Sequence, residues 1–229
     1  MTVINMSTHT PRIVLVITTV LYPDYGLGVG VHGGGDTLDQ RHALYRENIA
    51  HNVNLVSGLG IEVVVVENSA AARGLKRTVL DGLGTKVLYT NSSSMKLGCV
   101  ARWKGLRETR DLKLACLAIG CNDDDIVIKL TGLYRLSDNS FFEAVRSTIG
   151  QYDVAYKQCP DYKIVLGLIA MRYGFLKNAI TKGPSDVRFC PEAMYADDIS
   201  NTVPESRILV VDKLGLIRRY SGVAEPEYL

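Results

Sequence analysis

The stretch that decides the fold is Asp125-Ile-Val-Ile-Lys129-Leu-Thr131-Gly132-Leu-Tyr134-Arg135. Its first half has the apolar, β-branched pattern of a buried strand, and an acidic triplet precedes that strand. Its second half changes to Lys, Thr, Gly and Tyr, a mixture that no core requires. In an open α/β sheet, ligands bind beyond the carboxyl ends of the strands. The polar half of the stretch therefore lies where a binding site is expected.

Apolar strand candidates alternate with helical stretches along the whole chain. This alternation predicts an α/β sheet with helices on both faces. Strands are predicted at 12–19, 62–67, 86–90, 126–130, 153–157, 164–171 and 207–211. Helices are predicted at 37–57, 99–119, 139–149, 172–181 and 192–202. No repeat or Pro-rich linker divides the chain, so residues 1–229 are expected to form one domain, with 1–11 and 221–229 as candidate mobile tails.

The composition excludes several classes of protein. With 229 residues and 47% hydrophobic content, the chain can bury one substantial core. A net charge of +2 gives no electrostatic reason to expect a nucleic-acid partner. No apolar run is long enough to span a bilayer, and the polar start does not resemble a signal peptide. The odd number of cysteines, five, fits reduced thiols, so we expect a cytoplasmic protein; the oligomeric state is left open.

Polar residues also follow the first three predicted strands. Taken singly, each is typical of a turn or a helix cap, and it is their convergence on one sheet edge that indicates a site. Lys96 precedes a predicted helix, where a cation beside free backbone N–H groups favours a phosphate. The residues concerned are Thr18, Thr19, Glu67, Asn68, Asn91 and Lys96.

Lys129 lies inside an otherwise apolar strand. Burying its ammonium costs free energy of desolvation unless the group reaches an anion or water. A contact with a phosphate or a sugar hydroxyl is one interpretation, and a side chain that extends to solvent from the strand end is the other.

Gly28-Val-Gly30-Val-His-Gly33, within the glycine-rich residues 26–35, matches the G-x-G-x-x-G pattern of dinucleotide-binding folds. That pattern should turn directly from a strand into a helix, whereas here several residues intervene on both sides. We favour a mobile loop beside a ligand pocket. An NAD(P)-binding oxidoreductase that uses this loop is kept as an alternative, as is a non-catalytic nucleotide-sugar-binding module.

The segment from Lys129 to Tyr134 resembles the K-x-T-G-R-Y element of a group of small GT-A-type glycosyltransferases, which has bacterial and large-DNA-virus members. Leu133 replaces the Arg of that element, and Arg135 follows the Tyr. The resemblance extends over most of the chain. It covers Ile13–Thr18, Val66–Ser69, Leu88–Asn91, Lys96–Gly98, Tyr152–Val154 and Gly167–Arg172.

This resemblance implies a single-domain GT-A fold, with a mixed, mostly parallel sheet flanked by helices. It implies a glycosyltransferase that moves a sugar from a nucleoside-diphosphate sugar, with a UDP-sugar as the first choice, to an acceptor hydroxyl of a glycan. No tightly bound cofactor is expected. The element Lys129, Thr131, Gly132 and Tyr134 would line the donor pocket, and Lys96, Lys129 and Arg172 would face the leaving diphosphate.

GT-A enzymes often hold a divalent ion with a D-x-D pair, and the resemblance places Thr131-Gly132-Leu133 at that position. Neither Thr nor Leu replaces a hard carboxylate ligand. Asp123-Asp124-Asp125 precedes the strand, at its amino end, and is read as a solvated turn. No protein metal site is therefore predicted, and metal dependence is left open.

Two acidic residues of the predicted helix 192–202 are candidate catalytic groups. In many inverting GT-A enzymes a carboxylate on a helix in this region deprotonates the acceptor. The resemblance makes Asp198 the first candidate for this base and Glu192 the second. The alternative is that these acids simply stabilise the first turns of the helix.

Overall fold

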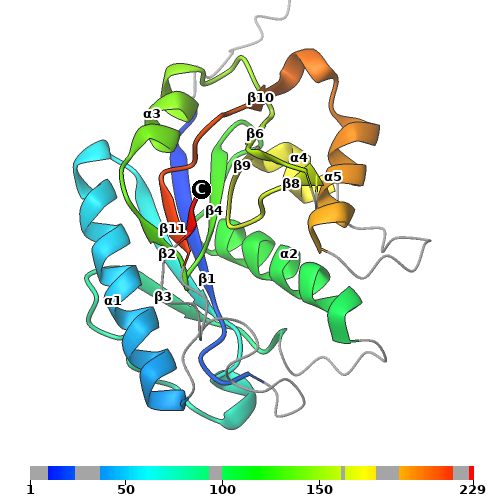
Figure 1. The fold of residues 1–229 in the computed structure, drawn as a ribbon. Coiled ribbons are helices and arrows are strands. Elements are labelled where there is room, and N and C mark those ends of the chain that lie inside the picture. The colour runs from blue at the N-terminus through cyan, green and yellow to red at the C-terminus, as the bar shows by residue number, and fades with distance from the viewer. Residues whose placement is uncertain (1–9, 24–36, 93–99, 161–162, 179–190, 219–226) are drawn as a thin grey trace, which may run out of the picture.

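The computed structural model describes residues 10–23, 37–92, 100–160, 163–178, 191–218 and 227–229, with the backbone alone for 100–105 and 227. Within this part of the chain, seven strands form one sheet in the order β10-β6-β9-β4-β1-β2-β3, between two helical layers (Figure 1). Its strands are β1 (Ile13–Thr19), β2 (Glu62–Glu67), β3 (Lys86–Tyr89), β4 (Ile126–Thr131), β6 (Val154–Tyr156), β9 (Leu168–Arg172) and β10 (Ile208–Val210). The helices are α1 (Leu38–Val56), α2 (Val100–Ala118), α3 (Ser140–Ser147), α4 (Tyr173–Asn178) and α5 (Pro191–Thr202).

All strands of this sheet except β9 run in the same direction. β1 pairs in parallel with β2 and β4, β2 with β3, and β6 with β10. β9 lies between β4 and β6 and is antiparallel to both. The prediction of a mixed, mostly parallel sheet flanked by helices is thus confirmed. Because it is reversed, β9 begins at the edge of the sheet where its neighbours end.

Local sequence accounts for the start of α1. Thr37 Oγ1 accepts a hydrogen bond from the Gln40 backbone N–H at 3.2 Å, and Gln40 Oε1 accepts one from the Thr37 N–H at 3.1 Å. This reciprocal capping box satisfies two of the free donors at the helix start. The other long helices also lie within one or two residues of their predicted bounds.

The predicted strand 164–171 is wrong in one respect, because the structure divides it. The first part is β8 (Lys163–Ile164), which forms a hairpin with β7 (Gln158–Cys159), and the second part is β9. The apolar residues Leu166 and Leu168, on either side of the Gly167 that precedes β9, are both buried. Hydropathy alone therefore does not mark the bend between the two strands.

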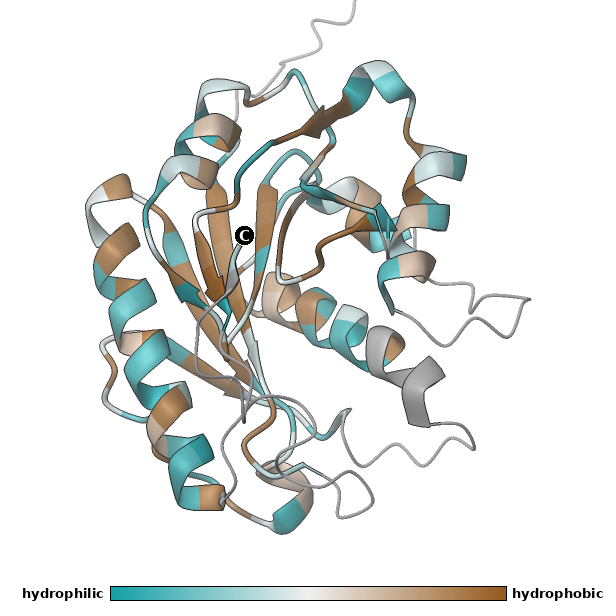
Figure 2. Cartoon of the chain, in the orientation of Figure 1, coloured by the Kyte–Doolittle hydropathy of each residue, from teal (hydrophilic) through white to brown (hydrophobic). Residues whose placement is uncertain are grey.

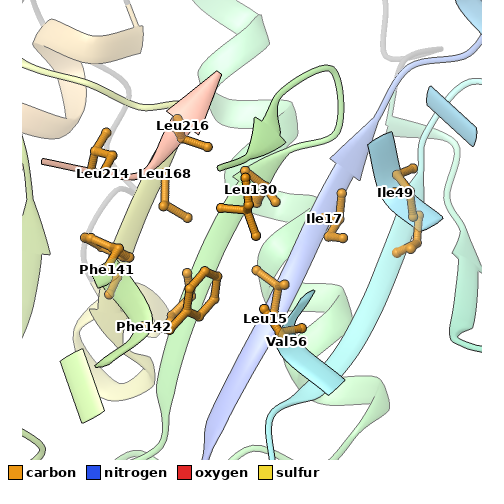
Figure 3. Packing of buried hydrophobic residues seen from close by; sticks show 14 of the residues in the cluster. Leu15, Ile17, Ile49, Val56, Leu130, Phe141, Phe142, Leu168, Leu214 and Leu216 are labelled. Carbon is orange, nitrogen blue, oxygen red and sulfur yellow. The ribbon is translucent and has the colours of Figure 1, made fainter. Parts of the chain in front are cut away.

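One face of the sheet packs against α1 and α3. Leu15 and Ile17 of β1 meet Ile49 of α1 and Phe142 of α3 in a continuous apolar cluster (Figure 3). Leu216 of β11 (Leu216–Arg218) extends the cluster. β11 belongs to a small sheet with β5 (Arg135–Leu136) and β12 (Glu227–Tyr228). The predicted tails 1–11 and 221–229 lie partly outside the described residues, but the backbone of Leu229 bonds to that of Leu216 at 2.9 Å.

The opposite face packs against α2, α4 and α5. Val14 and Val16, which alternate with Leu15 and Ile17 along β1, join this second cluster. All seven residues of β1 are buried because helices cover both faces, as the brown colour of the central strands in Figure 2 illustrates. None of the described helices combines the length and the apolar composition needed to cross a bilayer.

Candidate functional site

The carboxyl ends of β1, β2 and β4 meet at one edge of the sheet, and successive residues there point to opposite faces. Val16 of β1 and Val127 of β4 pack on the α2 face. Thr18 and Lys129, two residues further along, therefore point to the same face. The predicted residues are divided in this way: Thr18, Asn68, Lys129 and Thr131 face α2, and Thr19, Glu67 and Gly132 face α1.

Lys129 is the centre of a buried polar network beneath α2. Its side chain is 3% exposed, and its Nζ lies 3.0 Å from Glu108 Oε1 of α2. The same Nζ donates to Thr131 Oγ1 at 2.9 Å and to the backbone carbonyl of Leu166. Thr18 Oγ1 donates to Glu108 Oε1 at 2.8 Å. The ammonium thus has three acceptors for its three N–H groups, which offsets the cost of burying its charge.

A second network, centred on Asp111 of α2, joins the ends of β2 and β3. Asp111 is fully buried, and its Oδ1 accepts from Thr90 Oγ1 at 2.7 Å and from Ser92 Oγ at 2.6 Å. Its Oδ2 accepts from Asn68 Nδ2 at 2.9 Å. Burial raises the pKa of Asp111, while these three donors oppose the rise. The Asn68 Nδ2 group donates to Asp111, and this bond fixes the orientation of the amide. The Asn68 Oδ1 is a buried acceptor without a hydrogen-bond donor among the described residues.

Glu108 and Asp111 are the functional candidates that sequence reasoning missed. They are three positions apart, so they lie on one face of α2 and reach neighbouring strand ends. Glu108 binds the ends of β1 and β4, and Asp111 binds those of β2 and β3. An acidic pair at this spacing, within a helix whose other charged residues are basic, is the signal that could have identified them.

On the α1 face, Glu67 and Thr19 hold the strand ends together. Glu67 is fully buried, and its carboxylate accepts from the backbone N–H groups of Leu21 at 3.0 Å, Ser69 at 3.1 Å and Ala70 at 2.6 Å. It also accepts from the Ser69 hydroxyl. Thr19 Oγ1 donates to a backbone carbonyl of β2 at 3.0 Å. Their contact with a nucleotide stays a prediction.

Gly132 lies where the chain after β4 passes closest to β1. Its N–H donates to the Thr18 carbonyl at 2.9 Å. A Cβ at position 132 would lie 2.8 Å from Thr19 Cγ2 and 3.1 Å from the Thr18 oxygen, so packing alone requires a glycine there. Tyr134 is partly buried just beyond, with the Arg218 guanidinium 5.5 Å from its ring centroid.

Three further predicted features lie at or beyond the limits of the description. Asn91 follows β3 and is exposed. Lys96 and the glycine-rich residues 26–35 lie outside the described residues. β1 ends at Thr19 and α1 begins at Leu38, so a long connection replaces the direct strand-to-helix turn of a dinucleotide-binding fingerprint.

α5 carries the two predicted base candidates. Asp198 is half-buried, and its Oδ2 has no hydrogen-bond partner within the described chain. Burial raises the pKa of Asp198, and the charge of the adjacent Asp197 raises it further. Glu192 lies in the first turn of α5 and is partly exposed. Asp198 is therefore a half-buried carboxyl group with a raised pKa, an environment that is common among functional carboxylates.

Tyr195 connects α5 to the α2 face of the sheet. It is fully buried, and its hydroxyl lies 2.7 Å from Thr109 Oγ1 of α2. Burial raises the pKa of Tyr195, and the charges of Glu108 and Asp198 raise it further. Thr109 is adjacent to Glu108, and Asp198 lies about one helical turn from Tyr195, so this contact brings the Lys129 network and Asp198 into the same region of the protein.

The structure places Arg172 away from this region, and its predicted role at the leaving group is wrong. β9 is antiparallel, and Arg172 pairs in register with Ile126, the first residue of β4. Its guanidinium binds Asp124 at 2.8 Å and Asp153 at 2.7 Å. The carboxyl end of β9 thus lies at the amino edge of its neighbours, opposite the candidate site.

Asp123, Asp124 and Asp125 also lie at this amino edge, as predicted, but they are paired rather than simply solvated. Asp125 is fully buried and accepts from the Arg12 Nε at 2.9 Å, and Asp123 binds Lys177 at 2.7 Å. Among the described residues, no three His, Cys, Asp or Glu side chains are grouped so that they could hold a metal ion. Metal dependence therefore stays open to experiment.

The chain has the fold of nucleotide-diphospho-sugar transferases. No family model matches the sequence, and no curated protein matches it. A protein from Desulfovibrio desulfuricans assigned as a nucleotide-diphospho-sugar transferase superposes with a TM-score of 0.54 at 10% identity, over 88% of this chain and 80% of that one. A cytidylyltransferase from Leptospira borgpetersenii gives 0.53 at 10% identity, over 93% and 79%. A 4-diphosphocytidyl-2C-methyl-D-erythritol synthase from Anaerococcus prevotii gives 0.52 at 11%, over 88% and 86%.

These likenesses confirm the predicted GT-A-like fold. At 10–11% identity they establish the fold alone. The closer resemblance to glycosyltransferases with a K-x-T-G-R-Y element, and every role assigned to single residues, are therefore matters for proposal and test.

Proposed function

We propose that the protein is a cytoplasmic glycosyltransferase that moves a sugar from a nucleoside-diphosphate sugar, with a UDP-sugar as the first choice, to an acceptor hydroxyl of a glycan. One observation carries the proposal. The contact between Thr109 and Tyr195 joins α2, whose Glu108 pairs with the buried Lys129, to α5, which carries Asp198, on one face of the sheet. In open α/β sheets the carboxyl ends of the strands, where Thr18 and Thr131 lie, are the usual place for a ligand.

In this proposal the nucleotide binds across the ends of β1, β2 and β4. Asn68 supports this placement because its amide orientation is fixed by Asp111, so that its buried Oδ1 can accept a hydrogen bond. An acceptor at that position complements an N–H of a base, and uracil offers one. Thr19 and Glu67 would contact the nucleotide from the α1 face of the same sheet edge, and Asn91 and Tyr134 from the segments that follow β3 and β4.

Lys129 has a more specific role than charge neutralisation. Glu108 balances its charge, and its N–H groups already have acceptors. We therefore assign Lys129 the task of positioning Thr131 and the end of β4, and Lys96 the direct contact with the leaving diphosphate. Catalysis then rests on positioning and on stabilising the charge of the leaving group. Thr131, Gly132 and Leu133 offer no carboxylate for a D-x-D ion.

Asp198 is the proposed general base, with Glu192 as the second candidate. In the transfer step the acceptor oxygen bonds to the anomeric carbon, the bond from that carbon to the phosphate oxygen breaks, and the nucleoside diphosphate leaves. The acceptor proton passes to the Asp198 carboxylate. The raised pKa of Asp198 makes its carboxylate a stronger base.

The first test is a thermal-shift panel of UDP, GDP, CDP, CTP and NAD with the purified protein. A ligand at about 100 times its Kd adds roughly 2.7 kcal/mol, which raises the Tm by about 5–10 °C at this chain length. We expect UDP to give the largest shift. A shift with NAD alone would favour the oxidoreductase instead.

The second test measures release of UDP from UDP-sugars in the presence of glycan acceptors. Asp198→Asn should lower turnover by about 10²–10⁴-fold and leave the affinity for UDP nearly unchanged. Asp197→Asn is the matched control, since Asp197 is the adjacent acid of α5 and binds Lys163 at 2.7 Å. Glu192→Gln tests the second candidate. If UDP binds but the parent protein releases none from any donor, the non-catalytic binding module is the better description.

A nucleotidyltransferase is a second candidate function, favoured by two of the structures that share the fold. Both are named for cytidylyl chemistry, and their TM-scores of 0.53 and 0.52 are close to that of the sugar-transferase neighbour. Such an enzyme would join a nucleoside triphosphate to a phosphorylated substrate and release pyrophosphate. Pyrophosphate release with CTP and sugar phosphates, without UDP release from UDP-sugars, would establish it.

A further inference from the structure

The carboxyl end of α2 brings two cysteines together. Gly120 follows the helix in the left-handed region, with φ of 64°. The Gly120 N–H donates to the Leu117 carbonyl at 3.2 Å, and the Cys121 N–H donates to the Cys116 carbonyl at 2.9 Å. This pair of bonds is the Schellman motif, in which the side chains of the first and last residues typically touch. Here those two residues are Cys116 and Cys121.

The two cysteines lie at the same helix end and in the same apolar cluster, but their thiols differ in environment. Cys116 is fully buried, whereas Cys121 is partly exposed. The interaction with Cys121 raises the pKa of Cys116, and the interaction with Cys116 lowers the pKa of Cys121. Cys121 is thus the accessible sulfur with the greater thiolate character, and Cys116 is the protected sulfur beside it.

Charged groups at the starts of β1, β2 and β4 interact with this turn and its cysteines. The Arg12 guanidinium donates to the carbonyls of Ile119 and Gly120, at 3.1 and 2.6 Å, and so holds the turn against the sheet. The charge of Arg12 lowers the pKa of Cys121, whereas Asp125 and Glu62 raise it. These residues lie at the amino edge of the sheet, so the pair is separate from the candidate donor site.

We propose that Cys116 and Cys121 form a redox-active dithiol site that low-molecular-weight disulfides, such as glutathione disulfide, convert to an intramolecular disulfide. The Cys121 thiolate attacks one sulfur of the glutathione disulfide, and one glutathione leaves as a thiolate. Cys116 then gives up its proton and attacks the Cys121 sulfur of the mixed disulfide, and the second glutathione leaves and takes up that proton. Two protein thiols are oxidised and one small disulfide is reduced to two thiols.

The geometry favours the attack of Cys116 on the mixed disulfide, so that the mixed disulfide neither persists nor is hydrolysed. A disulfide requires two side chains that face each other across a short backbone separation. The Schellman bonds already bring the two residues together in this way. Cys159, which is also partly exposed, lies on β7 and offers an internal comparison.

The test is a titration of the whole protein with glutathione mixtures, followed by acid quenching, alkylation of free thiols and tryptic mass spectrometry. Residues 114–129 form one tryptic peptide that contains both cysteines, so the disulfide appears as the loss of two hydrogens without alkylation. We expect this peptide to oxidise and to be restored by reduced glutathione, while Cys159 stays alkylatable. Cys116→Ser should instead accumulate glutathione on Cys121, and Cys121→Ser should leave Cys116 unmodified.

A backbone variant tests the dependence on the turn. Gly120→Ala places a Cβ in the left-handed region, and disulfide closure should slow by about tenfold. Gly58→Ala is the matched control, because Gly58 lacks a positive φ and a Cβ there meets no atom within 4 Å. The proposal is overturned if Cys121 of the wild-type protein ends as a stable mixed disulfide with glutathione. It is also overturned if, in the glutathione mixtures that oxidise Cys159, both cysteines of peptide 114–129 stay reduced. None of these outcomes depends on whether the protein transfers sugar.

Discussion

Removing the charge of Glu108 should expose how strongly the Lys129 network supports the fold. Glu108→Gln preserves the shape of the side chain but leaves the Lys129 ammonium, 3% exposed, without its counter-ion at 3.0 Å. At that distance and an effective dielectric constant of about 20, the lost Coulomb attraction is about 5.5 kcal/mol. The variant also avoids burying the Glu108 charge, and Thr131 and Leu166 still accept from Lys129. We therefore expect a net loss of about 2–3 kcal/mol, or roughly 4–12 °C in Tm.

Thermal denaturation by circular dichroism measures this effect, and Glu47→Gln is the matched control. Glu47 binds Arg135 at 2.8 Å, but its side chain is 64% exposed, so losing that pair should cost about 0.5 kcal/mol or less. Lys129→Met combined with Glu108→Gln should be less destabilised than the sum of the two single variants. Equal Tm shifts for Glu108→Gln and Glu47→Gln, or additive effects in the double variant, would refute the reasoning.

Three further predictions concern single side chains. Burial raises the pKa of Asp198, so the folded protein loses stability as the pH rises through the interval between the unfolded and the folded pKa of this group. Asp198→Asn should therefore raise the Tm at pH 7 and lose this advantage near pH 3. Calorimetry at several pH values would measure the difference. Asp111→Ala leaves three buried strand-end donors without their acceptor, and urea unfolding should show a loss of about 3–5 kcal/mol; a loss below about 1 kcal/mol would contradict this. Gly132→Ala forces a Cβ to 2.8 Å from Thr19 Cγ2 and should lower the free energy of unfolding by about 1–3 kcal/mol without any ligand present. An unchanged Tm with weaker UDP binding would instead indicate a direct contact with the nucleotide.

The fold could be predicted from sequence because its local signals agree with one another. The valine run of β2 ends at polar residues, and the start of α1 is marked by Thr37 and Gln40, which form a capping box. The direction of β9 could not be predicted in this way. Residues 168–172 have the same apolar pattern whether the strand is parallel or antiparallel, and the error over Arg172 followed from that.

The sequence predicts at which edge of the sheet the candidate residues lie, but not which face of the sheet each side chain points to. Sequence places Thr18 and Thr19 together at the end of β1, yet the pleat sends them to opposite sides of the sheet. Which face matters is decided by the rotation of α2, which presents Glu108 and Asp111 to the strand ends. That rotation depends on packing between distant segments, so no local pattern around position 129 contains it.

The pairing of β1 with β4 has a consequence for synthesis of the chain. Arg12 and Asp125, which immediately precede these two strands, are 113 residues apart in sequence. β1 can pair with β2 early, but its other edge stays open until β4 has emerged from the ribosome. An open edge on a strand whose seven residues are all buried in the finished fold is prone to aggregation. Nascent chains that end before residue 131 should therefore depend on chaperones, and production of the protein should improve when chaperones are abundant.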